Sequence, residues 1–213
     1  FTHRCAFCSG RMTDTPPEKA RILPSGGIVR GLPLSEYDHT VPAFRRIPNL
    51  FEIVSYDYWH ANYGFEMDAE TRQRMDNYLS DPVGREHVLK IVRTKRKAAH
   101  LPETSEEELV DQAAGFFAGG HDVIVAGRHF ERGAQDDSQL ASSGTLSAEE
   151  HLLFMQLTID AMRDLYERNR YAPYVVAFQN WLQPAGASFE HLHKQLVAID
   201  DRGMASHREV QML

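Results

Sequence analysis

The decisive stretch of the chain reads Gly186-Ala187-Ser188-Phe189-Glu190-His191-Leu192-His193-Lys194-Gln195-Leu196-Val197-Ala198-Ile199. Alternate residues of an extended strand share one face at a spacing of about 6.6 Å, which predicts that His191, His193 and Gln195 project together. This row suits a phosphate group, because a neutral imidazole can attack phosphorus while an amide N–H donates to the phosphate oxygens. His193, the middle residue, is the candidate nucleophile. A strand whose histidines are simply polar and hydrogen-bonded explains the same spacing, so other segments must decide.

Length and composition point to a globular protein that can bury a core. The chain has 213 residues, of which 42% are hydrophobic and 25% are charged, and this size fits one domain, with room for an insertion. No uninterrupted apolar run reaches the length of about 20 residues that a membrane span requires, so we expect a soluble, cytoplasmic protein without membrane contacts. The net charge of −7 argues against a nucleic-acid surface. The basic run at residues 90–97 is predicted to be a solvated helix face.

The N-terminal part of the chain lacks a periodic pattern. Residues 1–34 are predicted to form an irregular, ordered loop, because prolines and glycines interrupt the segment repeatedly. Residues 43–54 are predicted to form two short strands separated by a turn at Pro48-Asn49, which would present Asn49. The chain opens on Phe1 and its motifs begin almost at once. We therefore expect a piece of a longer polypeptide.

Helical patterns dominate residues 67–117, where three helices are predicted. The first covers residues 68–79, the second carries Pro82 in its first turn, and the third is capped by Ser105 with Glu108.

Strands and one long helix account for the rest of the chain. A buried strand is predicted over residues 121–126, and it brings His129 to the strand end. A polar loop over 133–144 precedes a long helix that is capped by Ser147 with Glu150. Its apolar residues are predicted to pack in the core: Leu153, Leu157, Ala161 and Leu165. A strand over 174–178 and a loop that begins at Asn180 then lead into the decisive stretch.

The two cysteines suggest a metal site. Cys5-Ala6-Phe7-Cys8 has the spacing of a zinc half-site, although a redox pair or two ordinary thiols also fit. A closed zinc site needs two more ligands, and the chain has eleven histidines to supply them. His129 and His191 are the candidates, because both lie next to the ends of predicted strands.

Several separated segments resemble one known family. Cys5-Ala6-Phe7-Cys8-Ser9-Gly10, with Thr15-Pro16-Pro17-Glu18 downstream, resembles the Cys-Pro-Phe-Cys-Pro-Gly stretch and Pro-Pro-Glu of the galactose-1-phosphate uridylyltransferases. These enzymes form the transferase branch of the histidine-triad superfamily. Arg46-Ile47-Pro48-Asn49 resembles their Pro-Asn turn, and His121–Val125 with His129 resembles their His-Glu-Val-Val strand and its zinc-binding histidine. Residues 178–195 resemble their Phe-Glu-Asn segment and their His-Pro-His-x-Gln motif. The order of the segments agrees, and together they cover about half of the chain.

The resemblance implies an α+β fold with a histidine-triad-like antiparallel sheet, packed helices and a helical insertion at about residues 66–118. It implies a single histidine-triad-like domain over residues 1–213, with a zinc loop over 1–34, as the N-terminal half of a longer protein. It also implies roles for individual residues. In the family pattern zinc would be structural and bound by Cys5, Cys8, His129 and His191. His193 would be the nucleophile, Gln195 and Ser188 would contact the transferred phosphate, and Asn49 and Asn180 would hold the nucleotide.

The implied activity is nucleotidyl transfer in carbohydrate metabolism, as in galactose metabolism. A nucleoside monophosphate would move between sugar phosphates through a covalent nucleotidyl-histidine, so the expected ligands are a nucleotide sugar, first of all a UDP-sugar, and a sugar phosphate. Gln195 in place of a third histidine separates this branch from the hydrolases, because an amide cannot activate water as imidazole can. Family members are commonly dimers, so a homodimer is an expected assembly.

The chain departs from the family pattern in ways that leave two alternatives open. Leu192 stands between the histidines where proline is usual, Ser9 replaces a proline, and the helical region is an addition. These departures favour a phosphorylase that acts on ADP-glucose or dinucleoside polyphosphates. Typical members also have a second similar half, which these residues do not contain, and this difference motivates the other alternative, a non-catalytic zinc-stabilised nucleotide-binding module.

Overall fold

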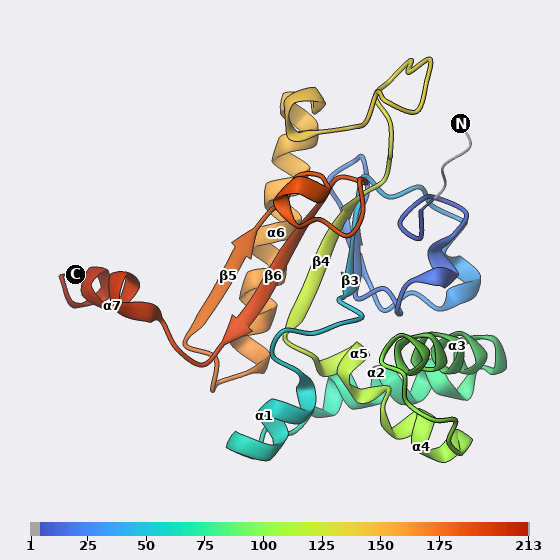
Figure 1. The fold of residues 1–213 in the computed structure, drawn as a ribbon, viewed down its shortest axis with the longest axis vertical. Coiled ribbons are helices and arrows are strands. Elements are labelled where there is room, and N and C mark those ends of the chain that lie inside the picture. The colour runs from blue at the N-terminus through green and yellow to red at the C-terminus, as the bar shows by residue number, and fades with distance from the viewer. Residues whose placement is uncertain (1–4, 213) are drawn as a thin grey trace.

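A six-stranded antiparallel sheet organises residues 5–212, the part of the chain that the computed structural model describes (Figure 1). The strand order is β2-β1-β3-β4-β6-β5. The strands are β1 (Ala20–Ile22), β2 (Ile28–Arg30), β3 (Phe44–Pro48), β4 (His121–Ala126), β5 (Tyr174–Phe178) and β6 (His193–Ile199). The predicted α+β class with an antiparallel sheet and packed helices is therefore confirmed.

The long helix α6 (Ala148–Arg168) covers one face of the sheet. Ser147 and Glu150 form the predicted capping box, in which each side chain accepts a hydrogen bond from the other residue's backbone N–H. The helix packs its apolar stripe on side chains from alternate strand positions, and Phe154 stacks on Phe44 of β3 at a ring-centroid distance of 4.5 Å. The main core on this face includes Ile22, Phe44, Ile124, Leu157, Ala161, Leu165, Leu192 and Leu196.

The opposite face of the sheet carries the cysteine loop. Phe7 packs there with Ile47, Val123 and Val125, and Phe189 from the loop before β6 joins this smaller cluster. Because side chains alternate along a strand, residues next to those under α6 point to this second face. The sheet therefore separates the main core from the candidate site.

Helices α2 (Ala69–Ser80), α3 (Pro82–Ala98), α4 (Glu106–Asp111) and α5 (Ala114–Ala118) form a second core of their own. We call these four helices the helical layer; Figure 1 shows them grouped near one end of the sheet. Asp68, Asp81 and Ser105 cap α2, α3 and α4 by accepting a backbone N–H at the third helical position. Within residues 67–117 the prediction of three helices missed α5, whose five residues are too few to show helical periodicity.

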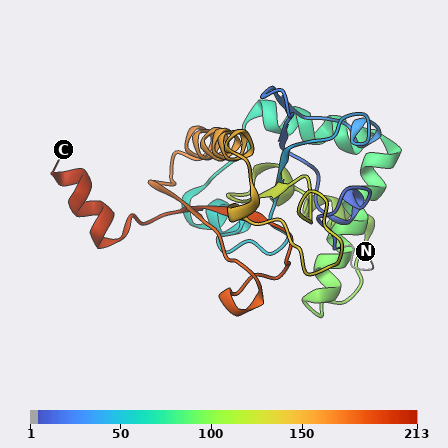
Figure 2. The same ribbon diagram turned by 90° about the horizontal axis from the view of Figure 1, so that it is seen from above.

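Two further helices flank these units. α1 (Tyr56–Tyr63) follows the turn after β3, with Ser55 as its N-cap and Gly64 in the left-handed conformation at its C-terminus. α7 (Gly203–Gln211) projects away from the other elements in both views (Figures 1 and 2). Over residues 5–212, no helix is long and apolar enough to cross a membrane.

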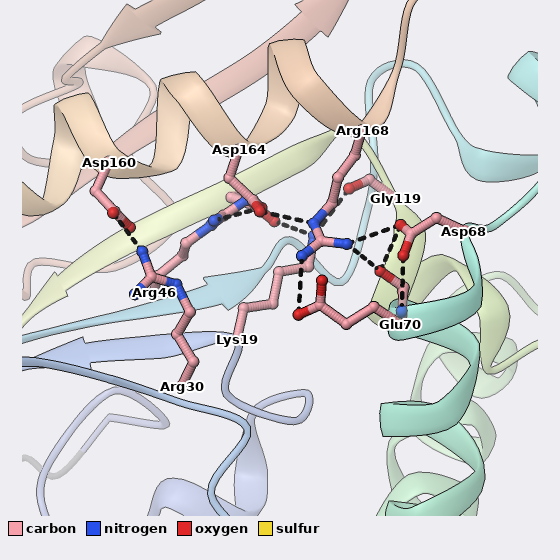
Figure 3. Close-up of polar contacts among 11 residues, drawn as sticks. Lys19, Arg30, Arg46, Asp68, Glu70, Gly119, Asp160, Asp164 and Arg168 are labelled. Atoms are coloured by element: carbon pink, nitrogen blue, oxygen red, sulfur yellow. Dashed lines mark hydrogen bonds and ion pairs between the residues drawn. The ribbon is translucent and has the colours of Figure 1, made fainter.

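A network of ion pairs joins the sheet, α6 and the helical layer (Figure 3); it is buried at the sheet and partly exposed where it reaches α2. Asp122 of β4 is fully buried and accepts from Lys19 Nζ and Arg46 Nε, both at 2.7 Å. Arg46 also reaches Asp164 of α6, and Arg168 of the same helix pairs with Asp164 and with Asp68 at the start of α2. These charges are compensated within the protein, as buried charges must be.

Two strand predictions were wrong for local reasons. Residues 20–30 form a hairpin instead of a loop, closed by a turn in which Gly26 has a positive φ of 88°. Strands of three residues are too short to reveal an alternating pattern. Residues 50–54 do not form a second strand, because the Asn49 side chain accepts the Phe51 N–H and turns the chain toward α1.

Candidate metal centre and His193 cavity

Four ligand atoms converge beside the start of β6. The sulfur atoms of Cys5 and Cys8 lie 3.7 Å apart. The Nδ1 atom of His129 lies 3.9 Å and 3.2 Å from these sulfurs, and Nδ1 of His191 lies 3.6 Å and 3.9 Å from them. These four residues form a cluster that could hold a metal ion. The structure thus brings together the whole predicted ligand set.

Local backbone geometry and strand pairing build this cluster. The Cys8 N–H donates to the Cys5 carbonyl at 3.1 Å, and this tight turn places both thiols on one side. His129 follows the end of β4 and His191 precedes β6, and the two strands pair antiparallel with Val125 opposite His193. Antiparallel pairing sets the end of one strand beside the start of the next, so residues 62 positions apart in sequence meet.

The distances fit a tetrahedral ion. Ligand bonds of about 2.3 Å for Zn–S and about 2.0–2.1 Å for Zn–N would separate two sulfurs by roughly 3.8 Å and a sulfur from a nitrogen by roughly 3.6 Å. The Cys5–Cys8 distance of 3.7 Å and the sulfur–nitrogen distances of 3.2–3.9 Å bracket these values. Two thiolates and two imidazoles are a donor set that suits zinc and related soft or borderline ions.

Hydrogen bonding and burial prepare these ligands for a cation. Nε2–H of His191 donates to the Ala126 carbonyl at 2.7 Å, which leaves the lone pair on Nδ1 directed at the cysteines. Burial lowers the pKa of His191 to about 3, so the ring is neutral. Burial raises the pKa of the Cys5 thiol to about 11. A bound cation would offset the free energy needed to ionise this buried thiol and would stabilise the thiolate form.

A cavity of about 230 Å³ lies next to the cluster on the same face of the sheet. Four predicted site residues line it: Asn49, Ser188, His193 and Gln195. Its apolar wall includes Phe7, Phe51 and Phe189, and Thr15 and Pro16 close another side. A small, mostly apolar cavity with a few converging polar groups is typical of a ligand site.

His193 is held in one orientation at this cavity. Its Nδ1–H donates to the His191 carbonyl at 2.7 Å, and the Phe7 ring meets it edge-on at 5.4 Å. Burial lowers the pKa of His193, so the imidazole is neutral and carries its lone pair on Nε2. The residue is 6% exposed. An imidazole in this state can act as a nucleophile.

Gln195 is oriented by two neighbours. The backbone N–H of Ile53 donates to Nδ1 of His121, so Nε2 of this neutral ring carries the proton. That N–H lies 2.9 Å from Oε1 of Gln195, and Nδ2 of Asn49 donates to the same oxygen at 3.3 Å. Its oxygen is occupied twice, and among the described residues nothing accepts from its NH₂ group, which is therefore available to a ligand.

His121 was missed as a site residue by the sequence analysis. The strand that it begins was predicted, and alternation placed it on the same face as Val123 and Val125. Its partner could not be identified, because the diagonal contact between His121 and Gln195 depends on the register of β4 against β6.

Comparison with known proteins places this chain in a family. The model of a family described as a domain of unknown function (DUF4921) matches residues 1–213. The chain is a member of this family. No curated protein and no solved structure matches it. For this DUF4921 protein, the site's own geometry therefore carries the functional argument.

The structure of the DUF4921 chain also places His191, Asn180 and Leu192 relative to the cavity. His191 does not line the cavity; it points into the cysteine cluster, and β6 begins only at His193. Asn180 also does not line the cavity, and its Nδ2 lies in the preceding loop, 3.6 Å from the point where a Cβ on Gly186 would stand. Leu192 is fully buried in the core that packs on α6, so its side chain does not face the cavity.

Proposed function

We propose that this protein is a nucleotidyltransferase that uses His193 as a covalent nucleophile and holds a structural zinc ion with Cys5, Cys8, His129 and His191. The observation that carries this proposal is the neutral His193 ring in a cavity that it shares with Gln195, Asn49 and Ser188. The resemblance to the galactose-1-phosphate uridylyltransferases supports the same assignment.

In the first step, Nε2 of His193 attacks the α-phosphorus of a nucleoside diphosphate sugar. A P–N bond forms, the bond from that phosphorus to the bridging oxygen breaks, and its electron pair leaves with the sugar phosphate. In the second step, an oxygen of the acceptor phosphate attacks the same phosphorus, and the P–N bond breaks to restore His193. Two in-line displacements retain the configuration at phosphorus.

Gln195 and Ser188 are assigned to the phosphate oxygens. The NH₂ group of Gln195 donates to an oxygen on which charge develops, while its carbonyl oxygen is held by His121 and Asn49. The leaving group is itself a phosphate with a pKa of about 6, so it needs no general acid. The amide offers no base for water, and an acceptor phosphate is therefore preferred to hydrolysis.

The metal has an indirect role in this proposal. Bound zinc supplies rigidity, because it fixes His191 to the cysteine turn, and His191 lies two residues before the nucleophile. The His191 carbonyl is also the acceptor for His193 Nδ1–H, so the same residue aims the ring. The aromatic wall of Phe7, Phe51 and Phe189 provides stacking surfaces for a nucleobase.

Intact-mass measurement tests the covalent step. The metal-loaded protein is incubated separately with UDP-glucose, ADP-glucose and a dinucleoside tetraphosphate. We expect a mass increase of one nucleoside monophosphate from one donor class, which His193→Ala abolishes and His39→Ala, at an exposed histidine, leaves unchanged. The absence of an adduct from every donor, with wild type and His193→Ala indistinguishable, would contradict the proposal.

A second measurement identifies the acceptor. The adduct is isolated and mixed with a hexose 1-phosphate or with inorganic phosphate. We expect the hexose 1-phosphate to discharge the nucleotide as a nucleotide sugar. Discharge by inorganic phosphate alone, with release of a nucleoside diphosphate, would keep His193 as the nucleophile but replace the transferase by a phosphorylase.

A further inference from the structure

A second cavity lies between the helical layer and the β1–β2 side of the sheet. Its volume is about 510 Å³, and it shares no lining residue with the His193 cavity. Residues 17–19 and 31–33 line it from the sheet side, α2 contributes one face, and Phe116 and Phe117 of α5 close it. The cleft therefore exists only because the helices pack against the sheet.

The walls of this cleft combine apolar surface with charged groups that are mostly compensated. Leu32, Pro33, Phe116 and Phe117 provide apolar surface. Lys19 is bound to Asp122 and to the Gly119 carbonyl, and Glu70 lies 3.6 Å from Arg168 (Figure 3). Glu18 is paired with Arg21, and Asp81 caps α3.

Arg74 is the exception among the charged groups of the cleft. Its side chain is half-buried on α2, and a Cβ on Gly31 would stand 3.4 Å from its Cδ. Gly31 has a positive φ of 64°, so the backbone conformation and the close approach both favour glycine there. Among residues 5–212, no group lies within ion-pair or hydrogen-bond distance of the Arg74 guanidinium. Burial, together with the nearby Arg168 and Arg46, lowers the pKa of Arg74 against the opposing effects of Asp164 and Glu70.

We propose that this cleft binds a small organic anion, a carboxylate or a phosphate carried on an apolar body. Arg74 supplies a fork of N–H donors that matches either group, and the anion supplies the direct hydrogen-bond partner that the half-buried guanidinium lacks. The apolar body lies against Leu32, Phe116 and Phe117, where burial of apolar surface adds affinity.

The cleft and the His193 cavity are lined by adjacent parts of one segment, residues 14–19. Residues 14–16 line the His193 cavity and residues 17–19 line the cleft. The inference does not depend on the proposed catalysis, because none of its residues takes part in that reaction.

Titration followed by nuclear magnetic resonance tests this site with three probes: phenyl phosphate, benzoate and inorganic phosphate. We expect saturable shifts of the Leu32, Phe116 and Phe117 resonances with phenyl phosphate or benzoate, and weaker binding of inorganic phosphate, which lacks the apolar body. Arg74→Gln should weaken binding by about tenfold or more, the loss expected for one charge-assisted pair. Arg72→Gln, at an exposed arginine of the same helix, should bind as wild type does.

Two results would overturn the inference. One is the absence of saturable shifts at the cleft with all three probes; the other is equal binding by Arg74→Gln and wild type. Thermal unfolding of both variants verifies that they fold. Shifts confined to Ser188 and Gln195 would place the probe in the His193 cavity instead, and would also count against the cleft. His193→Ala should leave binding at the cleft unchanged, so a failure of the catalytic proposal is seen separately.

Discussion

His191 and His193 are two residues apart, yet their hydrogen bonds make opposite ring nitrogens available. His191 donates from Nε2 to the Ala126 carbonyl and presents Nδ1, whereas His193 donates from Nδ1 to the His191 carbonyl and presents Nε2. Each ring is neutral because burial lowers its pKa. The same residue type can thereby offer Nδ1 to a metal ion at one position and Nε2 to a ligand in the cavity at the other.

Because His121 orients the Gln195 amide, we expect a substitution of His121 to affect the reaction. His121→Phe removes the N–H that holds Oε1 of Gln195, so the amide can rotate and its donors lose their aim. We expect His193 nucleotidylation to slow by about tenfold, and by about a hundredfold in Gln195→Ala, which removes the donor itself. Quenched intact-mass time courses measure both rates.

A suitable control for this prediction is His151→Phe, at an exposed histidine that contacts the Ser143 carbonyl. Its rate should equal that of wild type. Metal content should be unchanged in His121→Phe, because His121 is not a ligand. An unchanged rate in His121→Phe would show that the Gln195 amide needs no such support.

Pairing between elements builds the candidate metal site, since the cysteine turn contributes two possible ligands and the β4 and β6 ends contribute one each. Arg45 of β3 stabilises the cysteine turn through two hydrogen bonds. Its guanidinium donates to Thr15 Oγ1 at 3.1 Å and to the Phe7 carbonyl at 3.4 Å. A metal ion in the cluster would therefore tie three separate parts of the chain together.

Removal of one ligand should affect stability more than chemistry. Cys8→Ser is expected to weaken zinc binding by more than about a hundredfold, beyond the effect typical of outer-shell changes. We expect a loss of about 3 kcal/mol or more in the free energy of unfolding, which is roughly 6–12 °C in Tm at this chain length. Metal analysis and thermal unfolding measure the two effects.

Ser9→Ala, next to the ligand, is the matched control, and it should keep about one zinc ion per chain. His193→Ala should do the same while losing the adduct. A wild-type protein that folds fully after metal-free preparation and binds no zinc would contradict the metal assignment.

Close packing inside the helical layer makes a prediction about Gly84. A Cβ on Gly84 of α3 would stand 2.3 Å from the backbone carbonyl oxygen of Tyr78 in α2. Gly84→Ala should therefore destabilise the protein by about 1–2 kcal/mol, although alanine has the higher helix propensity. A Cβ on Gly27 would have its nearest neighbour 3.9 Å away, so Gly27→Ala should lower the free energy of unfolding, measured in urea, far less. Stabilisation by Gly84→Ala would show that the two helices can move apart at little cost.

The molecule as a whole uses the two faces of its sheet for different tasks. One face packs on α6 and supplies most of the core, and the other carries the candidate metal site and the cavity. The helical layer reaches that cavity through α3, where His87 Nε2 lies 2.8 Å from the Thr15 carbonyl and Lys90 pairs with Asp14. Figure 3 shows a second connection, in which Arg168 of α6 pairs with Asp68, the N-cap of α2.

Glu52, between the sheet and the helical layer, should make stability depend on pH. Its carboxylate lies against Gly115 and Gly119, accepts only a long hydrogen bond from the Tyr56 N–H, and has its other oxygen buried without a partner in the described residues. Burial raises its pKa to about 7, against the opposing effects of Lys95 and Lys19, and Asp122 adds to the rise.

The sign of the effect follows from this shift. The folded protein keeps the proton that the unfolded chain releases near pH 4.5, so stability falls as pH rises from 4.5 to 7 and stays lower above 7. Glu52→Gln should match wild type at pH 4.5 and exceed it at pH 8 by up to about 3 kcal/mol. Urea unfolding at both pH values measures the difference, with exposed Glu107→Gln as control. Parallel pH profiles of wild type and Glu52→Gln would contradict this origin.

Local sequence patterns were enough to predict the helices and strands in which apolar residues recur with a clear period or which an N-cap residue precedes. The strands at 121–126 and 174–178, the helix after Ser147 and the helices after Asp68, Pro82 and Ser105 all lie where expected. The four metal ligands could be proposed because the Cys-x-x-Cys spacing and the resembling motifs are themselves properties of the sequence. The identity of the metal and the reaction stay predictions.

The remaining features depend on contacts between residues far apart in the chain. The short β1–β2 hairpin, the His121–Gln195 contact and the cleft around Arg74 each require strand register or the packing of helices on the sheet. Periodicity and capping describe interactions within a few residues, so they reveal which face of an element is apolar. Long-range packing and hydrogen bonding in the folded molecule determine which element covers that face and how each polar side chain is oriented.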